Sequence, residues 1–257
     1  MQGRNKWSLV GGLGVASIYA ILCGYMFLRQ QQLLYQPEKN RDKTNDDVVF
    51  LPQLDLYGWI DNPGQNNAVI YYGGSSEPVQ LRRRHFSSFT KETKYFIPYR
   101  GFWPNQNRVP TEKQIKEDAE KIFDYVKKRH EKVFLVGRSL GTSMALHVAA
   151  RRKPDKLVLI TPFYSILEIA QKKYRFFPIQ KILKDWHEAH KDAGNIDVDS
   201  MIFLAENDKV TPLDSWKRLR EHLNKSYKEF LVAGSNHTDI VQSSELWRKM
   251  RRFLRSK

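Results

Sequence analysis

A chain of 257 residues with 41% hydrophobic side chains is long enough for one globular domain with a sizeable core and a short appendage. The formal net charge of +15 comes from 43 basic residues scattered among 28 acidic ones. No zinc-finger spacing or RNA-recognition aromatic motif accompanies that charge, so we expect no nucleic-acid partner. Cys23 is the only cysteine, which excludes an internal disulfide and a thiolate metal site.

The first predicted element is a membrane anchor. Residues Trp7 to Leu28 carry no charge, and basic residues flank the run on both sides. At about 1.5 Å per residue, a helix of that length just spans the ~30 Å hydrocarbon layer. The bulky Leu22 stands where signal peptidase requires a small residue, which favours an uncleaved anchor over a signal peptide. We therefore predict one N-terminal transmembrane helix within residues 1–29 and a single-pass membrane protein, with the side of the membrane left open.

A polar linker is predicted over residues 30–45, and one globular domain over residues 46–257. The domain contains eight short runs rich in β-branched and aromatic side chains. Runs without polar alternation are typical of strands buried on both faces. The runs are Val48–Leu51, Leu56–Ile60, Ala68–Tyr72, Tyr95–Pro98, Val133–Val136, Leu157–Ile160, Met201–Ala205 and Glu229–Val232.

Helical patterns separate most of these runs from the third onward. One such helix begins with a capping box formed by Thr111 and Gln114. Strands that alternate with helices indicate an α/β fold, with a mostly parallel eight-stranded sheet covered by helices on both faces. Only the short linker at Pro52 and Gln53 joins the first two strands, so we expect an antiparallel edge there.

The strongest chemical signal is a G-x-S-x-G motif, Gly137 to Gly141, between the fifth strand and the helix after it. The sharp turn that this position requires exposes the serine hydroxyl at the carboxyl edge of the sheet, as in the nucleophile elbow of α/β-hydrolases. An ordinary glycine-rich loop is the structural alternative. We predict Ser139 as a catalytic nucleophile.

A serine nucleophile needs a base, and the base needs an orienting acid. The α/β-hydrolase order is Ser, acid, His. His237 follows the eighth strand and Asp208 follows the seventh, so both are expected at the edge that holds Ser139. Glu206 is the nearest rival acid. The other histidines are interpreted as helical or surface residues: His85, His130, His147, His187, His190 and His222.

Two backbone N–H groups are expected to bind the oxyanion that forms on acyl attack. One belongs to Leu140, directly after the nucleophile. The other belongs to Ser75, in the Gly73–Glu77 loop after the third strand, where a plain turn is the alternative. No metal site and no cofactor are predicted.

At this point the chain resembles a family, the membrane-anchored α/β-hydrolases that include monoacylglycerol lipases, lysophospholipases and protein depalmitoylases. The matching stretches are YYGGSSEPV, YRGFWPNQNRVPTE, VGRSLGTSMA, ITPFYSI, AENDKVTP and GSNHTDI. The resemblance implies the α/β-hydrolase fold, an acyl-enzyme route, and Ser139, Asp208 and His237 as the triad. Many relatives have His-Gly-Asn where this chain has Gly73-Gly74-Ser75, which leaves the side-chain contribution of that loop open.

An insertion between the sixth and seventh strands, at about residues 163–199, is long enough for a small cap. Its aromatic and aliphatic side chains suit an acyl chain, although such residues are often simply core. The predicted substrate contacts are Tyr164, Ile166, Phe176 and Phe177.

Two functional hypotheses follow from these features. The first is a membrane-anchored serine hydrolase that cleaves carboxylic esters or thioesters, with an acyl substrate and the lipid bilayer as its partners. The alternative is a non-catalytic membrane scaffold that keeps the hydrolase fold, since a fold alone does not establish a function. The presence of all three triad residues favours the enzyme.

Overall fold

The computed structural model describes the backbone of residues 4–36, 47–106, 109–224 and 227–256, and the side chains of these from residue 14 onward. Its centre is one eight-stranded sheet in the order β1-β2-β4-β3-β5-β6-β7-β8. β3 to β8 run parallel, and β2 runs antiparallel to both β1 and β4. The eight predicted strands and the antiparallel edge are thus confirmed. The strands are β1 (Val49–Leu51), β2 (Leu56–Asp61), β3 (Asn67–Tyr72), β4 (Glu92–Phe96), β5 (Lys132–Arg138), β6 (Lys156–Ile160), β7 (Ser200–Ala205) and β8 (Tyr227–Val232).

Alternating side chains along the strands divide the core into two layers. On β5, Val133 and Leu135 pack into one layer, while Phe134 and Val136 pack into the other. The first layer is covered by α2 (Glu112–Lys127), α3 (Leu140–Arg152), α6 (Ala189–Ala193) and α7 (Leu213–Arg220). The second is covered by η2 (Val79–Phe86), η3 (Asp239–Gln242) and α8 (Ser244–Arg255). Both faces of the sheet are therefore buried, as the sequence predicts.

The start of α2 follows the predicted capping pattern. The Thr111 hydroxyl accepts a hydrogen bond from the backbone N–H of Gln114 at 3.3 Å. The apolar stripe that follows is buried against the sheet and α3. The cap insertion between β6 and β7 contains α4 (Ile166–Lys173), α5 (Ile179–Ile182) and α6.

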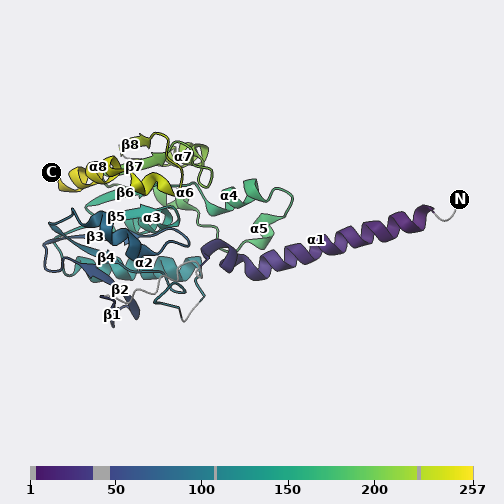
Figure 1. The fold of residues 1–257 in the computed structure, drawn as a ribbon, viewed down its shortest axis with the longest axis horizontal. Coiled ribbons are helices and arrows are strands. Elements are labelled where there is room, and N and C mark those ends of the chain that lie inside the picture. The colour runs from purple at the N-terminus through teal and green to yellow at the C-terminus, as the bar shows by residue number, and fades with distance from the viewer. Residues whose placement is uncertain (1–3, 37–46, 107–108, 225–226, 257) are drawn as a thin grey trace.

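A long helix, α1 (Arg4–Tyr35), projects from the domain, and its N-terminus lies at the opposite end of the molecule from the C-terminus (Figure 1). Its C-terminal part contacts α5. The predicted linker over residues 30–45 is wrong for residues 30–35, which continue the helix. These residues include no glycine or proline, and Gln30 and Tyr35 are buried against the domain. Residues 37–46 of that linker lie outside the described residues.

The predicted membrane anchor, residues 1–29, falls largely on α1, but its side chains before residue 14 lie outside the described residues. In the part of the chain that the structure describes, no helix is long and apolar enough to cross a membrane. The predicted transmembrane helix is therefore not supported.

Candidate active site

Ser139 occupies a strained turn between β5 and α3. Its φ of +49° and ψ of −120° are angles that side-chain-bearing residues rarely adopt. Hydrogen bonds hold this geometry, because the Ser139 N–H donates to Ile160 O at 2.9 Å and the Ser139 carbonyl accepts from the Thr142 hydroxyl at 2.6 Å. The turn places the hydroxyl at the carboxyl edge of the sheet, facing the cavity described below.

The two glycines of the motif are required by close backbone approach. A Cβ on Gly137 would lie 2.5 Å from the carbonyl oxygen of Gly141. A Cβ on Gly141 would overlap the carbonyl oxygen of Tyr72, on the neighbouring strand β3. Larger residues would therefore push α3 away from the sheet and displace Ser139.

His237 lies between Ser139 and Asp208. Its Nε2 is 2.9 Å from Ser139 Oγ, and its Nδ1 is 2.8 Å from Asp208 Oδ2. The loops after β7 and β8 bring these groups to the same sheet edge, as the sequence predicts. The second carboxylate oxygen, Asp208 Oδ1, accepts from the backbone N–H groups of Val210 and Thr211, both at 2.8 Å. This spacing fits an imidazole that donates from Nδ1 and accepts the serine proton at Nε2.

The carboxylate of Asp208 is kept in its charged form. Burial alone would raise its pKa, but hydrogen bonds from His237 and Thr211 hold the pKa below its usual value. A charged Asp208 can both orient the imidazole and stabilise its protonated form. The rival acid Glu206 instead accepts from the N–H of Gly234 at 2.7 Å.

Arg138, directly before Ser139, contacts both the loop that holds His237 and the loop after β3. Its guanidinium donates to the carbonyl of His237 at 2.9 Å and lies 3.1 Å from the buried carboxylate of Glu77. Glu77 in turn accepts from the N–H of Gly74 at 2.6 Å. Burial would raise the pKa of Glu77, but the guanidinium groups of Arg138 and Arg82 hold it below the usual value. One ion pair thus joins the His237 loop to the Gly73–Glu77 loop.

Sequence reasoning missed this pair, although a signal was present. Arg138 is the last residue of the mostly apolar strand β5, Glu77 lies in the loop five residues after the end of β3, and both are buried. Buried charges are almost always paired. Two opposite charges at the carboxyl ends of neighbouring strands could therefore have been matched.

The predicted oxyanion loop is held by groups on other elements. The Tyr99 hydroxyl donates to the carbonyl of Gly73 at 2.7 Å, and the N–H of Ser76 donates to the carbonyl of Tyr35, the last residue of α1, at 3.0 Å. Ser75 and Leu140, the residues predicted to supply the two donors, line the same cavity as Ser139.

That cavity has a volume of about 210 Å³ and lies between α1, the cap and the sheet edge. Ser139, Ser75, Leu140 and Thr211 form its floor. Its walls are mostly apolar side chains from α1, α4 and α5. An apolar cavity with a few convergent polar groups at one end is typical of a ligand site.

Of the four predicted substrate contacts, only Ile166 is among the residues that line this cavity. Tyr164 instead stacks on His190 of α6, with ring centroids 4.0 Å apart. Phe177 stacks on Tyr19 of α1, and Phe176 is 74% exposed. The assignment of Tyr164, Phe176 and Phe177 is therefore corrected. The α1 side chains that line the cavity were not predicted, although Met26, Gln30 and Leu33–Leu34 are spaced to share one helix face.

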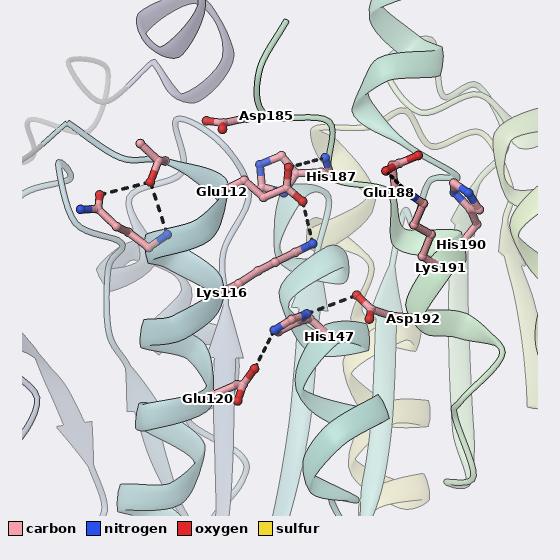
Figure 2. A network of polar contacts seen from close by, with 12 residues as sticks. Glu112, Lys116, Glu120, His147, Asp185, His187, Glu188, His190, Lys191 and Asp192 are labelled. Carbon is pink, nitrogen blue, oxygen red and sulfur yellow. Dashed lines mark hydrogen bonds and ion pairs between the residues drawn. The ribbon is translucent and has the colours of Figure 1, made fainter. Parts of the chain in front are cut away.

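Polar contacts attach the part of the cap that follows α5 to α2 and α3 (Figure 2). The backbone N–H of His187 donates to Glu112 at 2.9 Å, and His147 lies between Glu120 at 2.8 Å and Asp192 at 3.3 Å. The interpretation of His187 as a helical or surface residue is wrong, because its side chain is fully buried in a non-helical segment. His187 does not contribute to the candidate site described above.

Solved structures with the same architecture identify the fold. The α/β hydrolase MGS-M2 from a Medee basin deep-sea metagenome has a TM-score of 0.66 at 14% identity, over 82% of this chain and 98% of that one. The esterase EaEST from Exiguobacterium antarcticum has a TM-score of 0.63 at 12% identity, over 81% and 99%. The chain has the α/β-hydrolase fold.

Sequence relatives of this α/β-hydrolase agree with the structural neighbours, while no family model matches it. Lysophosphatidylserine lipase ABHD12 from Mus musculus is 30% identical over 237 residues, which cover 78% of this chain and 59% of that protein. The chain therefore matches less than two thirds of that relative. An uncharacterised protein of Mycobacterium tuberculosis is 25% identical over 94% of both chains. The named relatives and neighbours are lipases, esterases and hydrolases, which confirms the predicted class of enzyme, a serine hydrolase of α/β-hydrolase type.

Proposed function

We propose that this chain is a membrane-associated serine hydrolase that cleaves carboxylic ester or thioester bonds through an acyl-enzyme intermediate. The observation that carries the proposal is the continuous contact from Ser139 through His237 to Asp208 at the floor of an apolar cavity. In this proposal Ser139 is the nucleophile, His237 the base and Asp208 the orienting acid.

The proposed reaction has two halves. Ser139 Oγ attacks the acyl carbonyl carbon while His237 Nε2 takes the hydroxyl proton, and the N–H groups of Ser75 and Leu140 stabilise the oxyanion. The imidazolium then gives its proton to the leaving alcohol or thiol, and the acyl group remains on Ser139. In the second half His237 removes a proton from water as the water attacks the acyl carbon. The bond from that carbon to Ser139 Oγ then breaks, the imidazolium returns its proton to Oγ, and the acid is released.

The cavity supports an acyl substrate. Its walls above Ser139 present aliphatic side chains, which favour a hydrocarbon chain over a charged or strongly polar group. ABHD12 is named a lysophosphatidylserine lipase, and a lipid-derived acyl ester is accordingly a reasonable substrate class to test for this chain.

We also propose that α1 and the cap contact a lipid bilayer. The described part of α1 carries exposed apolar side chains at Val15, Ile18, Ile21, Leu22, Tyr25 and Leu28. The adjacent cap segment from Ile169 to Lys184 has five basic and no acidic residues, and it exposes Phe176. Exposed apolar side chains next to a basic segment suit a surface of anionic lipid.

Vesicle flotation tests the lipid contact. Ile21→Asp should reduce binding to vesicles that contain phosphatidylserine, whereas Leu231→Asp, at an exposed apolar position on β8, should leave binding unchanged. Equal binding by both variants and the parent would contradict the contact.

Covalent labelling tests the enzyme. A fluorophosphonate probe should label the full-length chain, and Ser139→Ala should remove the label. Ser143→Ala is the matched control, because Ser143 is also buried on α3 but has no hydrogen-bond partner for its hydroxyl among the described residues. A folded parent protein that neither takes the probe nor turns over any acyl ester would favour the non-catalytic scaffold.

A further inference from the structure

The N-terminal helix is fastened to the cap at separated points. Tyr19 stacks on Phe177, with ring centroids 5.5 Å apart and ring planes within 7°. Three turns later, the Gln30 amide donates to the carbonyl of Ile182 at 3.0 Å and accepts from the N–H of Lys184 at 2.6 Å. The α1 helix is thus bonded to the cap as a fixed structural element.

The end of α1 reaches the candidate catalytic site. The buried Tyr35 hydroxyl donates to Asp185 at 2.8 Å and lies 2.9 Å from His187 Nε2. The Tyr35 carbonyl accepts from the N–H of Ser76, next to the predicted oxyanion donor Ser75. The C-terminal end of α1 therefore lies beside the predicted oxyanion loop, and earlier residues of the helix lie progressively farther from that loop.

One face of α1 forms a wall of the cavity that contains Ser139. Met26, Gln30, Leu33 and Leu34 line it, and their spacing places them on one side of the helix. At about 1.5 Å per residue, Met26 lies roughly 12 Å farther along the helix than Leu34. The facing wall comes from the cap and includes Ile166, Ile169, Ala170, Ile179 and Ile182.

We propose that α1 is part of the acyl-binding site, so that an acyl chain attached to Ser139 runs along this helix and reaches Met26 at its distal end. Leu34 then contacts the methylene groups near the carbonyl, and Met26 determines how well long chains are accepted. The proposal rests on the proposed function and adds that α1 binds the acyl chain of the substrate. The same side chains that hold α1 to the cap also hold this wall in place.

Chain-length profiles of the full-length protein in detergent micelles test the proposal. Met26→Trp fills the distal cavity, so kcat/KM for p-nitrophenyl dodecanoate should fall about tenfold, while that for the butanoate stays within about twofold. Ala170→Trp fills the same space from the cap and should produce the same selective loss. Leu28→Trp is the matched control, because Leu28 is 79% exposed and points away from the cavity.

The outcomes separate this inference from the function on which it rests. Equal losses on both esters for Met26→Trp and Ala170→Trp, or no loss on either ester, would overturn the acyl-wall assignment. So would a selective loss in Leu28→Trp as large as that in Met26→Trp. In each of these cases fluorophosphonate labelling of Ser139 still reports whether the chain is a serine hydrolase. Failure of that labelling removes the proposed function itself.

Discussion

The floor of the cavity is built on the sheet, whereas its walls come from α1 and the cap. The floor residue Ser139 is hydrogen-bonded to His237, which is hydrogen-bonded to Asp208, and backbone N–H groups of the loop after β7 donate to that carboxylate. The walls are held by contacts between α1 and the cap, such as Gln30 with α5 and Tyr35 with Asp185. Chemistry fixed on a rigid sheet can therefore stay constant while the wall changes what is bound.

The largest expected effects concern the floor residue Ser139 and the two residues linked to it by hydrogen bonds, His237 and Asp208. Ser139→Ala and His237→Ala should each reduce turnover by a factor on the order of 10⁶, because nucleophile and base act as one unit. Asp208→Ala should cost less, on the order of 10⁴, because the acid orients the imidazole without reacting. Asp214→Ala, an exposed carboxylate on α7, should stay within about tenfold of the parent.

That ranking is measured by steady-state ester hydrolysis on variants shown to fold by circular dichroism. Full activity in Ser139→Ala would remove the serine mechanism. A loss in Asp214→Ala that matches the loss expected for Asp208→Ala would mean that the acid is misassigned.

The next effect is on stability, and it concerns the support beneath the floor. Glu77→Gln leaves the buried guanidinium of Arg138 without its ion-pair partner, and this should lower the free energy of unfolding by roughly 3–5 kcal/mol. Asp61→Asn weakens the partly exposed pair with Arg83, which water can still reach, and should cost about 1 kcal/mol. Urea denaturation at pH 7 measures both, and similar losses in the two variants would contradict a structural role for the buried pair.

A third expected effect tests the attachment of the wall through pH. Burial lowers the pKa of His187 to about 4, from about 6.5 in an unfolded chain. Since the folded state resists protonation, this stabilising contribution is complete above pH 6.5. It should be lost as the pH falls toward 4, by roughly 3 kcal/mol in total. Nearby Glu112 opposes this shift and Lys116 reinforces it, while burial raises the pKa of Asp185 and gives a dependence of opposite sign.

Replacement of His187 isolates its part of the pH dependence. In His187→Gln the free energy of unfolding should change less between pH 7 and pH 4.5 than in the parent, because Asp185 and Glu112 are present in both proteins. His222→Gln removes an exposed histidine and should leave the parent's dependence intact. Parallel pH curves for the parent and His187→Gln would show that His187 contributes nothing.

The sequence predicts the floor well because its signals are local. Buried strands are mostly apolar runs, and Ser139, Asp208 and His237 each lie within five residues after the end of such a strand. In a parallel sheet the ends of those strands meet at one edge, so the strand positions bring the residues together without any knowledge of the helices. The catalytic roles of these residues, and those of Ser75 and Leu140, stay predictions for the experiments above.

The walls could not be predicted in the same way, because their contacts join distant parts of the chain. Tyr35 meets Asp185 across 150 residues, and Gln30 meets Ile182 across 152. No local pattern shows that the polar residues 30–35 will continue the apolar helix before them and pack against the domain. Tyr164 and Phe176 are residue types that often line a lipid pocket. Whether they do so here depends on the tertiary packing, which stacks Tyr164 on His190 and leaves Phe176 exposed.

The smallest expected effect comes from one hydroxyl group at the joint between the wall and the floor. Tyr35→Phe keeps the buried ring but leaves the Asp185 carboxylate and His187 Nε2 without the Tyr35 hydroxyl, at a cost of about 1–3 kcal/mol. In a domain of this size each kcal/mol lowers the midpoint of thermal unfolding by about 2–4 °C.

The Tyr35 carbonyl still accepts from Ser76, so the oxyanion loop keeps its support and turnover of a butanoyl ester should stay within about twofold. A looser α1 should instead raise KM for a dodecanoyl ester by a few fold. Tyr25→Phe, at an exposed position on the same helix, should change neither quantity. A fall in kcat for both esters with KM unchanged would mean that the Tyr35 hydroxyl supports the floor, and the division between floor and wall would not hold at this residue.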